Sequence, residues 1–552
     1  MKVYQRLAQA FKAEGVTATF GMMGDGNMYW ISELHKIGGV KVHEVRHEGA
    51  GLGMADGYAR TKQEPGVATA TCGPGVAQLA TAFVTAARAH SPVVAFCGEY
   101  PLSDPEYTQY LDQSRFAEAC EAGFVRLQNP EQTDDCVRKA FYLAKLERRP
   151  IMLSCPMDIQ QKEFEDADEP YKPTTELFKA RTVTPDAKEL ERAADLIASA
   201  KHPVIIVGRG AQWAGAGPAV LKLGERIGAL IATSLLAKTF LSDKTEYHAG
   251  ISGLYATRPA MKLLEEADVV IGVGASLNRH TLENGYLYPN AKYIQIDSQQ
   301  HVAMANGKFS DLYIQSDARI AVEALEKLLA EKSHKNTGYR TPDVKTKLAN
   351  HNADRTEFPI DPGTVDPRES MIALEELLPP SIGVLSGSGM TSGISSMLMT
   401  RPRAITQAGH FFGCIGQMMP AAMGAVLASG NKPHVLVDGD ASVMMHLAEF
   451  DTMIRNKMPL LIVVLNNEAL GSEYYKLDVH KMDKQLSVVP TPDMGAVARG
   501  FGGKGIMATK IEEVQKAAQE WVANPCPMII DARIERAVVT LPYRRIHYGS
   551  DE

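Results

Sequence analysis

Residues 434–467 read HVLVDGDASVMMHLAEFDTMIRNKMPLLIVVLNN. The stretch opens with a short apolar run that ends at Gly439-Asp440, and it closes with a longer apolar run that ends at Asn466-Asn467. A segment of helical character separates the two runs. Short apolar runs are typical of strands buried on both faces, and a strand–helix–strand succession predicts two parallel strands in one sheet. This stretch therefore predicts an α/β fold.

Asp440 and Asn467 stand 27 residues apart, and each follows one of the two predicted strands. Ligands of parallel sheets bind at the carboxyl ends of the strands, so we expect the two side chains on neighbouring loops of one edge. A carboxylate and an amide oxygen suit Mg²⁺, which is commonly held by one or two protein groups together with phosphate oxygens. Taken singly, the two residues are also typical of a helix cap and a turn. At this spacing they predict a metal and diphosphate anchor.

A similar plan occurs near the N-terminus. The run VATAT (67–71) leads into Gly73-Pro74-Gly75, a helix of small residues and a second apolar run. Two charged, proline-containing stretches, residues 163–186 and 331–370, break the alternation of strands and helices and are expected to be linkers. The sequence therefore predicts three doubly wound parallel-sheet domains, of which the two outer ones share one architecture. The expected bounds are 1–165, 186–330 and 365–540, with a C-terminal tail at 541–552.

Composition excludes several functional classes. Apolar residues make up 45% of the 552 residues and charged residues 22%, which is typical of a globular protein. The 58 Lys and Arg against 65 Asp and Glu give a net charge of −7, so neither nucleic acid nor a membrane is expected as a partner. Seven cysteines without a CxxC pair favour reduced thiols in a cytoplasmic protein over disulfides or zinc.

One segment, residues 411–430, has the length of a membrane span. Gln417, Pro420 and several glycines interrupt it, and most of its apolar residues are Ala and Met. We therefore expect a glycine-rich turn followed by a buried helix. The first 16 residues have polar side chains at helical spacing, which predicts an amphipathic helix and not a signal peptide.

Around these motifs the chain resembles the thiamine diphosphate (ThDP) enzymes of the acetolactate synthase, pyruvate decarboxylase and benzoylformate decarboxylase family. The family signature is Gly-Asp-Gly, a helix, a strand and Asn-Asn, and here Ala441 stands in place of the second glycine. VRHEGAGLGMADGYAR (45–60) resembles the segment with the family's cofactor-activating glutamate, and TCGPGVAQ (71–78) its Gly-Pro-Gly turn. GCIGQMMPAAMGA (413–425) resembles the loop around the aminopyrimidine ring. The resemblance covers nearly the whole chain and implies the family's three domains, named Pyr, middle and PP.

The resemblance implies a role for each motif residue. Glu48 would be the acid at N1′ of the aminopyrimidine, so that the cofactor's 4′-amino group can deprotonate the thiazolium carbon. Gly413 would accept a hydrogen bond from that amino group, and Ile415 would hold the cofactor bent. The implied ligands of Mg²⁺ are Asp440, the Asn467 side chain and the Ala469 carbonyl. The other implied cofactor-binding residues are Gly73, Pro74, Gln78, Ser386, Gly387, Ser388, Gly439, Ala441, Ser442, Leu470 and Gly471, and Gln78 departs from the Asn of many relatives.

Two further residues are candidates for catalysis. Glu473 stands where pyruvate-decarboxylase-like relatives have an acid that faces the substrate, although it is also typical of a solvated helix residue. His280 follows the predicted strand at 269–276, near the position of an active-site His in benzoylformate-decarboxylase-like relatives. A register of the Gly-Asp-Gly motif that uses Asp438 is disfavoured, because Glu449 then loses its usual place in the following helix.

The resemblance predicts an enzyme that depends on ThDP and Mg²⁺ and acts on a 2-oxo acid. It would work through a C2 ylid and an enamine, which is then protonated or added to a second carbonyl. Alternatives are a 2-hydroxyacyl-CoA lyase or oxalyl-CoA decarboxylase, and a noncatalytic family member. FAD is not expected, because VGRGAQWAGAG (207–217) is not a GxGxxG motif. A homodimer or homotetramer is expected, with Glu48 and Asp440 of one site coming from different chains.

Overall fold

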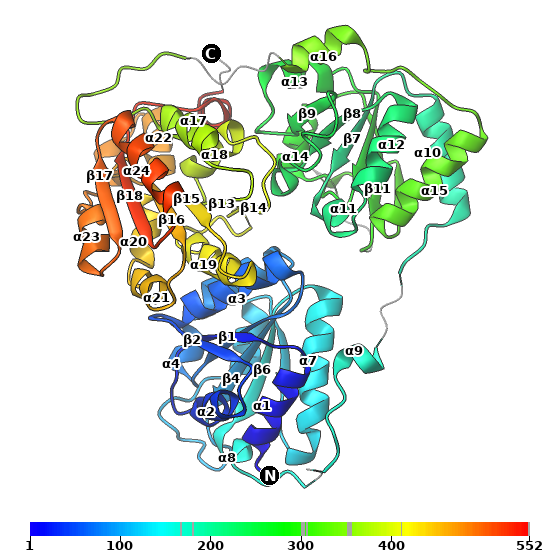
Figure 1. Ribbon diagram of the computed structural model, residues 1–552. Helices are drawn as coiled ribbons and strands as arrows, with labels where there is room; N and C mark the ends of the chain where they lie inside the picture. Colours follow the sequence, from blue (N-terminus) through cyan, green and yellow to red (C-terminus); the bar gives the residue numbers. More distant parts are fainter. Residues whose placement is uncertain are drawn as a thin grey trace.

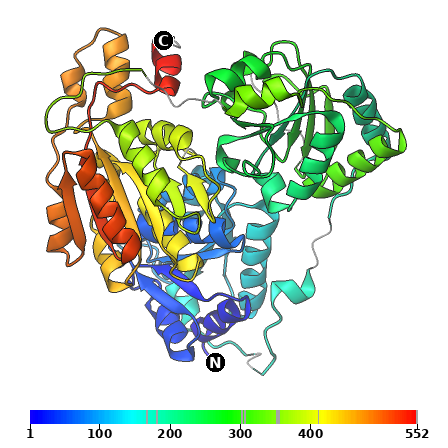
Figure 2. The same cartoon turned by 45° about the horizontal axis from the view of Figure 1, so that its top comes forward.

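The computed structural model describes residues 1–165, 168–178, 182–299, 304, 307–349, 356–409 and 411–549. Its strands form three six-stranded sheets, each parallel throughout and flanked by helices (Figure 1). Figure 2 shows the N-terminal domain behind the C-terminal domain, with the middle domain beside both. The predicted α/β class with three doubly wound parallel-sheet domains is confirmed.

The N-terminal domain has the strand order β2-β1-β3-β4-β6-β5. Its strands are β1 (Ala18–Gly21), β2 (Lys41–Glu44), β3 (Gly66–Ala70), β4 (Val93–Glu99), β5 (Gly123–Arg126) and β6 (Ile151–Pro156). Its helices are α1 (Val3–Ala13), α2 (Met28–Ile37), α3 (Glu48–Lys62), α4 (Pro74–Ala77), α5 (Ala80–Arg88), α6 (Gln113–Ala119), α7 (Thr133–Glu147) and α8 (Met157–Gln160). The residues of β3, β4 and β6 are all buried, as continuous apolar runs predict.

The C-terminal domain repeats this order in its own strands, as β14-β13-β15-β16-β18-β17. The strands are β13 (Gly383–Ser386), β14 (Thr406–Ala408), β15 (His434–Gly439), β16 (Leu460–Asn466), β17 (Lys504–Ala508) and β18 (Met528–Arg533). The helices are α17 (Pro367–Leu377), α18 (Met390–Leu398), α19 (Met418–Ala428), α20 (Asp440–Met445), α21 (Glu449–Arg455), α22 (Gly471–Val479), α23 (Met494–Gly500), α24 (Ile511–Ala523) and α25 (Leu541–Tyr543). The expected likeness of the two outer domains is confirmed at the level of topology.

The middle domain has a different order, β12-β11-β10-β7-β8-β9. Its strands are β7 (Pro203–Val207), β8 (Leu230–Thr233), β9 (His248–Ile251), β10 (Val269–Val273), β11 (Lys292–Asp297) and β12 (Leu312–Gln315). Its helices are α10 (Ala187–Ala198), α11 (Arg209–Trp213), α12 (Gly217–Ile227), α13 (Arg258–Leu264), α14 (Arg279–Leu282), α15 (Ala318–Glu331) and α16 (Pro342–Ala349), with a 3₁₀ turn, η2, at Leu235–Ala237. From β7 the chain adds β8 and β9 toward one edge of the sheet, and from β10 it adds β11 and β12 toward the other edge. Ligands of such sheets bind where this order reverses, between β10 and β7.

Helices α3 and α19 join the two outer domains and lie side by side in Figure 1. A Cβ on Gly57 would overlap the carbonyl oxygen of Ala421, and a Cβ on Gly424 would overlap that of Met54. Glycine lets the two backbones touch at both positions. The buried apolar side chains around this contact consequently form one core cluster that spans both domains, and each domain has a second cluster of its own.

The segment with the length of a membrane span contains α19, whose residues are almost all buried in that core, as expected. Among the described residues, no helix is both long and apolar enough to cross a membrane. The expected linkers contain more structure than predicted. In residues 331–370, α16 packs on α13 through buried Val344 and Leu348, so the middle domain extends past residue 330.

Candidate active site

The predicted metal ligands follow two neighbouring strands. β15 and β16 pair in parallel with Gly439 opposite Leu465, so both strands end at the same edge of the sheet. Asp440 is the first residue of α20, and Asn467 begins the loop between β16 and α22. Their side chains are nearly inaccessible, with 3% and 4% exposure. The structure therefore brings the predicted pair to one buried edge.

The Asp440 carboxylate is buried, and Arg533 acts on it only as a nearby charge. Among the described residues, no side chain donates a hydrogen bond to it or forms an ion pair with it. Burial raises the pKa of Asp440 to about 6, backbone amides at the helix start lower it, and Asp531 raises it further. A divalent cation would offset the cost of burying this negative charge. The residues present therefore fit a metal ion that binds a diphosphate.

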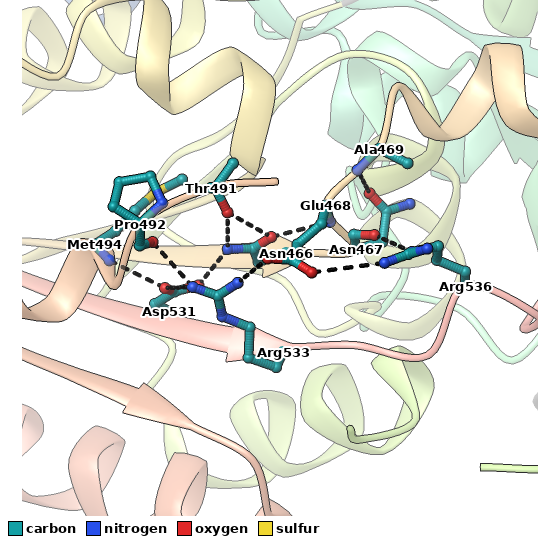
Figure 3. A network of polar contacts seen from close by, with 10 residues as sticks. All are labelled: Asn466, Asn467, Glu468, Ala469, Thr491, Pro492, Met494, Asp531, Arg533 and Arg536. Atoms are coloured by element: carbon teal, nitrogen blue, oxygen red, sulfur yellow. Dashed lines mark hydrogen bonds and ion pairs between the residues drawn. The ribbon is translucent and has the colours of Figure 1, made fainter. Parts of the chain in front are cut away.

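Figure 3 shows the polar network that holds the loop after β16. Asn466 Nδ2 donates to Asp531 Oδ1 at 2.7 Å and to Thr491 Oγ1 at 2.9 Å. Arg533 forms ion pairs with Asp531 at 3.0 Å and with Glu468 at 2.8 Å. Glu468 has a left-handed backbone with φ of 51°, and its amide donates to Asn466 Oδ1 at 3.0 Å. The network fixes the strained turn at Glu468, which lies between the predicted metal ligands Asn467 and Ala469.

Asn467 is oriented by that turn. Its Oδ1 accepts a hydrogen bond from the Ala469 amide at 3.1 Å, and its carbonyl accepts one from Arg536 Nε at 2.5 Å. Its Nδ2 lies against the sulfur of Met390 at 3.9 Å, which fixes the orientation of the amide. An amide oxygen has two lone pairs, so Oδ1 keeps one for a ligand. A Cβ on Gly471 would lie 2.8 Å from Asn467 Nδ2, which makes glycine the fitting residue there.

Asp438 has a structural role that sequence reasoning missed. Its carboxylate accepts hydrogen bonds from the following amide at 2.8 Å and from Ser442 Oγ at 2.7 Å. Ser442 Oγ in turn accepts from the Gly416 amide at 2.8 Å, and a Cβ on Gly387 would overlap the Asp438 carboxylate. Burial raises the pKa of Asp438 to about 7. Asp438 thus ties neighbouring loops together, whereas Asp440 stays open to a ligand.

The other predicted cofactor-binding residues of this domain lie on the same loops. Ser386 ends β13 and is buried. The Gly387 amide donates a hydrogen bond to the carbonyl of Val437 at 2.8 Å. Gly413 is exposed with φ of 71° and open space around its Cα, and Ile415 is half-buried. Leu470 precedes α22 and is 37% exposed. Their cofactor contacts stay predictions.

Glu48 is the first residue of α3 and lies against the Gly-Pro-Gly turn. A Cβ on Gly75 would stand 3.3 Å from Glu48 Oε1. His47 caps the helix by accepting the Gly49 amide hydrogen on Nδ1 at 3.0 Å. No described residue donates a hydrogen bond to the half-buried Glu48 carboxylate, which leaves it available to a ligand.

The turn itself is fixed by glycine. Gly73 has φ of 61°, and a Cβ there would overlap the carbonyl of Gln109. Pro74 is the first residue of the short helix α4, Gln78 follows its last residue, and both are exposed. The structure therefore assembles Glu48 and this predicted segment in one place.

Within one chain, Asp440 starts α20, whereas Glu48 lies near the other end of this helix. The ring of His47 lies 5.4 Å from that of His446, which follows the last residue of α20. Glu449 Oε1 accepts the amides of the two residues before Glu48, both at 2.9 Å. Six helical residues span about 9 Å at 1.5 Å each, so α20 separates the two predicted site residues.

Neither of the two further catalytic candidates joins this group within the chain. Glu473 lies on α22 with a 52% exposed side chain and forms an ion pair with Lys476 at 3.1 Å. His280 is exposed on α14 of the middle domain. Among the described residues, no hydrogen bond or ion pair links either side chain to Asp440 or Glu48. Their catalytic roles stay predictions.

The C-terminal segment is another feature that sequence reasoning missed. Tyr543 Oη and Ser472 Oγ share a hydrogen bond at 2.6 Å, and Tyr548 Oη donates to Asp478 at 3.1 Å. Arg545 forms an ion pair with Glu283, close after α14. The expected tail therefore ties α22 to the middle domain. The aromatic and basic residues of LPYRRIHY (541–548) were the available signal.

Comparison with protein families matches three successive parts of the chain. Residues 1–116 match the N-terminal TPP (thiamine pyrophosphate) binding domain of thiamine pyrophosphate enzymes, 190–326 the central domain, and 387–532 the C-terminal TPP binding domain. The chain belongs to the thiamine pyrophosphate enzyme family. This ThDP-enzyme family member therefore has the three domains that the motifs indicate, and thiamine diphosphate is the cofactor of the matched domains.

Relatives of this ThDP-enzyme family member share about a quarter of its residues over nearly full length. It is 27% identical to the probable acetolactate synthase large subunit of Methanocaldococcus jannaschii, over 97% of this chain and 92% of the relative. It is 26% identical to acetolactate synthase isozyme 3 large subunit of Escherichia coli, over 98% and 96%. It is also 27% identical to the sulfoacetaldehyde acetyltransferase of Alcaligenes xylosoxydans xylosoxydans, over 92% and 88%.

Proposed function

We propose that this protein uses ThDP and Mg²⁺ to cleave the carboxylate from a 2-oxo acid and to join the remaining acyl unit to a second carbonyl compound. One observation carries the proposal. The buried, unpaired Asp440 and the open Asn467 oxygen stand at one strand edge, whereas the unpaired Glu48 stands in the other outer domain. A degenerate, noncatalytic protein has no reason to keep the Asp440 and Glu48 carboxylates without partners.

Each residue has a defined task in this proposal. ThDP, when bound, supplies a nucleophilic carbon and an electron sink for decarboxylation. Asp440, the Asn467 side chain and the Ala469 carbonyl would hold Mg²⁺, which would supply positive charge for the diphosphate. Glu48, at the Gly-Pro-Gly turn, would donate a proton to the aminopyrimidine ring nitrogen. Ile415 would pack against the cofactor from the loop before α19.

We place the complete site between two chains. Within one chain α20 separates Glu48 from Asp440, so the acid and the metal ligands of one site come from different subunits. Exposed apolar side chains surround the metal loop, which supports a covered surface there. They are Leu470, Leu486 and Val489, on two segments joined by the backbone hydrogen bonds from Leu470 to Ser487 and from Val489 to Glu468. The seven cysteines are all free thiols, which supports work in the reducing cytoplasm.

Two reactions follow from the named relatives, and one assay separates them. The acetolactate synthases among the relatives support a reaction that forms acetolactate, and the sulfoacetaldehyde acetyltransferase supports an acetyl transfer that involves sulfoacetaldehyde. The purified protein, loaded with ThDP and Mg²⁺, should be screened with 2-oxo acids for carbon dioxide release and acyloin products. Parallel reactions contain sulfoacetaldehyde. We expect carbon dioxide release coupled to a new carbon–carbon bond, and turnover of sulfoacetaldehyde alone would contradict it.

A further inference from the structure

A cavity of about 510 Å³ lies where the three domains meet. The end of α3 lines it from the N-terminal domain, and α11 with the segment around η2 lines it from the middle domain. Residues 402–408 and Phe411 close it from the C-terminal domain. None of the predicted cofactor-binding or metal-binding residues lines this cavity, and Glu48 stands at the opposite end of α3.

The cavity is strongly basic. Its described lining carries five cationic side chains, which are Arg60, Arg209, Lys238, Lys244 and Arg403, and one carboxylate, Asp243. Three of the five cations have ion-pair partners. Arg60 pairs with Asp56, Arg403 with Glu375, and Lys244 with Asp243 at 2.8 Å. Arg209 and Lys238 have no ion pair with any carboxylate of the described residues.

Arg209 contacts only neutral groups. Its Nη1 donates to the carbonyl of Ala89 at 2.9 Å, and its guanidinium lies 4.8 Å from the Trp213 ring and 4.9 Å from the Phe411 ring. Burial lowers the pKa of Arg209 to about 9, and the neighbouring cations, among them Arg60, lower it further. The side chain thus lies near Arg60 and Arg148, and the nearby carboxylate that acts on it, Asp56, is already paired with Arg60.

Lys238 is in a similar state. Its side chain is buried, with 7% exposure, and Nζ donates to the carbonyl of Ser395 at 3.0 Å. Burial lowers the pKa of Lys238 to about 8, although Glu375 raises it. A buried charge without a partner is costly, and the cost disappears when an anion binds.

The rest of the lining indicates what kind of anion fits. Trp213, Phe240 and Phe411 supply aromatic surface, and Leu236 and Leu241 supply aliphatic surface. The volume is within the range of small-molecule pockets and far above that of an inorganic ion. Two cations of the middle domain without ion-pair partners, Arg209 on α11 and Lys238 after η2, line the same cavity and suit a doubly charged oxyanion.

We propose that this three-domain cavity binds a small organic phosphate, with the phosphate between Arg209 and Lys238 and the organic part against Trp213 and Phe240. The phosphate would replace the missing counter-charge of both side chains. The inference does not rest on the proposed reaction.

Calorimetry on the full-length protein tests this site. The protein is first saturated with ThDP and Mg²⁺, so that the diphosphate site is filled, and then titrated with phenyl phosphate, inorganic phosphate or benzoate. We expect one phenyl phosphate per chain, bound roughly tenfold more tightly than inorganic phosphate or benzoate. Absent binding of phenyl phosphate would overturn the proposal. Benzoate binding as tight would overturn the phosphate assignment, and inorganic phosphate binding as tight would overturn the organic one.

Variants locate the site. Arg209→Gln and Lys238→Gln should each weaken phenyl phosphate binding by roughly tenfold or more. Lys327→Gln is the matched control, because Lys327 is a 77% exposed lysine of the middle domain outside the cavity. Circular dichroism verifies that each variant is folded, and Lys238→Gln decides the matter if Arg209→Gln does not fold. Unchanged affinity in a folded variant would place the binding elsewhere.

Discussion

The two outer domains share one topology and differ in what their loops carry. After the third strand, the N-terminal domain has Gly73-Pro74-Gly75, and the C-terminal domain has Gly439-Asp440. The first turn brings a glycine beside the Glu48 carboxylate, whereas the second presents a carboxylate of its own. One scaffold can therefore supply the acid of a site and its copy the metal ligands, because the loops at the strand ends vary while the core does not.

The helices after the second strands show the same division. In the N-terminal domain, Glu48 starts α3 immediately after a short connection from β2. In the C-terminal domain, the corresponding connection from β14 to α19 is longer and contains Gly413 and Ile415. The two helices pack on each other, so the comparison predicts that changes at one loop affect acid chemistry and changes at the other affect cofactor retention.

The largest effect is expected from Asp440→Ala. Without this carboxylate, Mg²⁺ loses its only charged ligand among the predicted three, and Mg²⁺-dependent ThDP binding should disappear together with activity. Calorimetry with and without Mg²⁺ measures the loss. Asp438→Asn is the matched control, since it should retain Mg²⁺-dependent binding and lose stability instead. The reverse pattern would assign the metal to Asp438.

Glu48→Gln should affect chemistry and spare binding. The amide keeps the shape of the side chain but cannot donate the acid proton, so turnover should fall by about 10²- to 10⁴-fold with ThDP affinity nearly unchanged. Hydrogen–deuterium exchange at the thiazolium carbon and calorimetry measure the two quantities. Glu44→Gln, on exposed Glu44 of β2, is the control. Full turnover in Glu48→Gln would remove Glu48 from the mechanism.

Gly57→Ala tests the contact between the two domains. A Cβ there overlaps the backbone of α19, so the free energy of unfolding should fall by about 1–3 kcal/mol. Gly500→Ala is the control, because Gly500 ends α23 with open space around it, and Ala is favoured over Gly in a helix by up to about 1 kcal/mol. Chemical denaturation compares the two. Equal stability changes would mean that the helices do not touch as described.

The smallest effect concerns pH. In the proposed site a proton on Asp440 would compete with Mg²⁺, and the pKa of Asp440 is raised to about 6 by burial. Apparent Mg²⁺ affinity should therefore be constant above this pKa and fall by about tenfold per pH unit below it. Titrations of Mg²⁺ between pH 5 and 8 at saturating ThDP test this on the wild type. An affinity independent of pH over this range would contradict metal binding at Asp440.

The sequence predicted the scaffold better than the polar details. Continuous apolar runs such as β16 predicted buried parallel strands, and the Asp440–Asn467 spacing predicted a shared strand edge, because both depend on local pattern. The Arg533–Glu468 ion pair and the basic cavity were not predictable, since their residues are far apart in the sequence and meet only through the fold. Helix α16 was missed because its flanking prolines and charges are typical of a linker.

The central claim is that one outer domain supplies the acid, the other supplies the metal ligands, and one site uses domains of two chains. Mixing tests it most directly. Glu48→Gln and Asp440→Ala subunits, each inactive alone, are mixed under conditions that allow subunit exchange, and carbon dioxide release is measured. We predict partial recovery of activity, because some hybrid dimers contain one site with both wild-type residues. Subunits that exchange, as shown by native mass spectrometry, without any recovery would contradict the account.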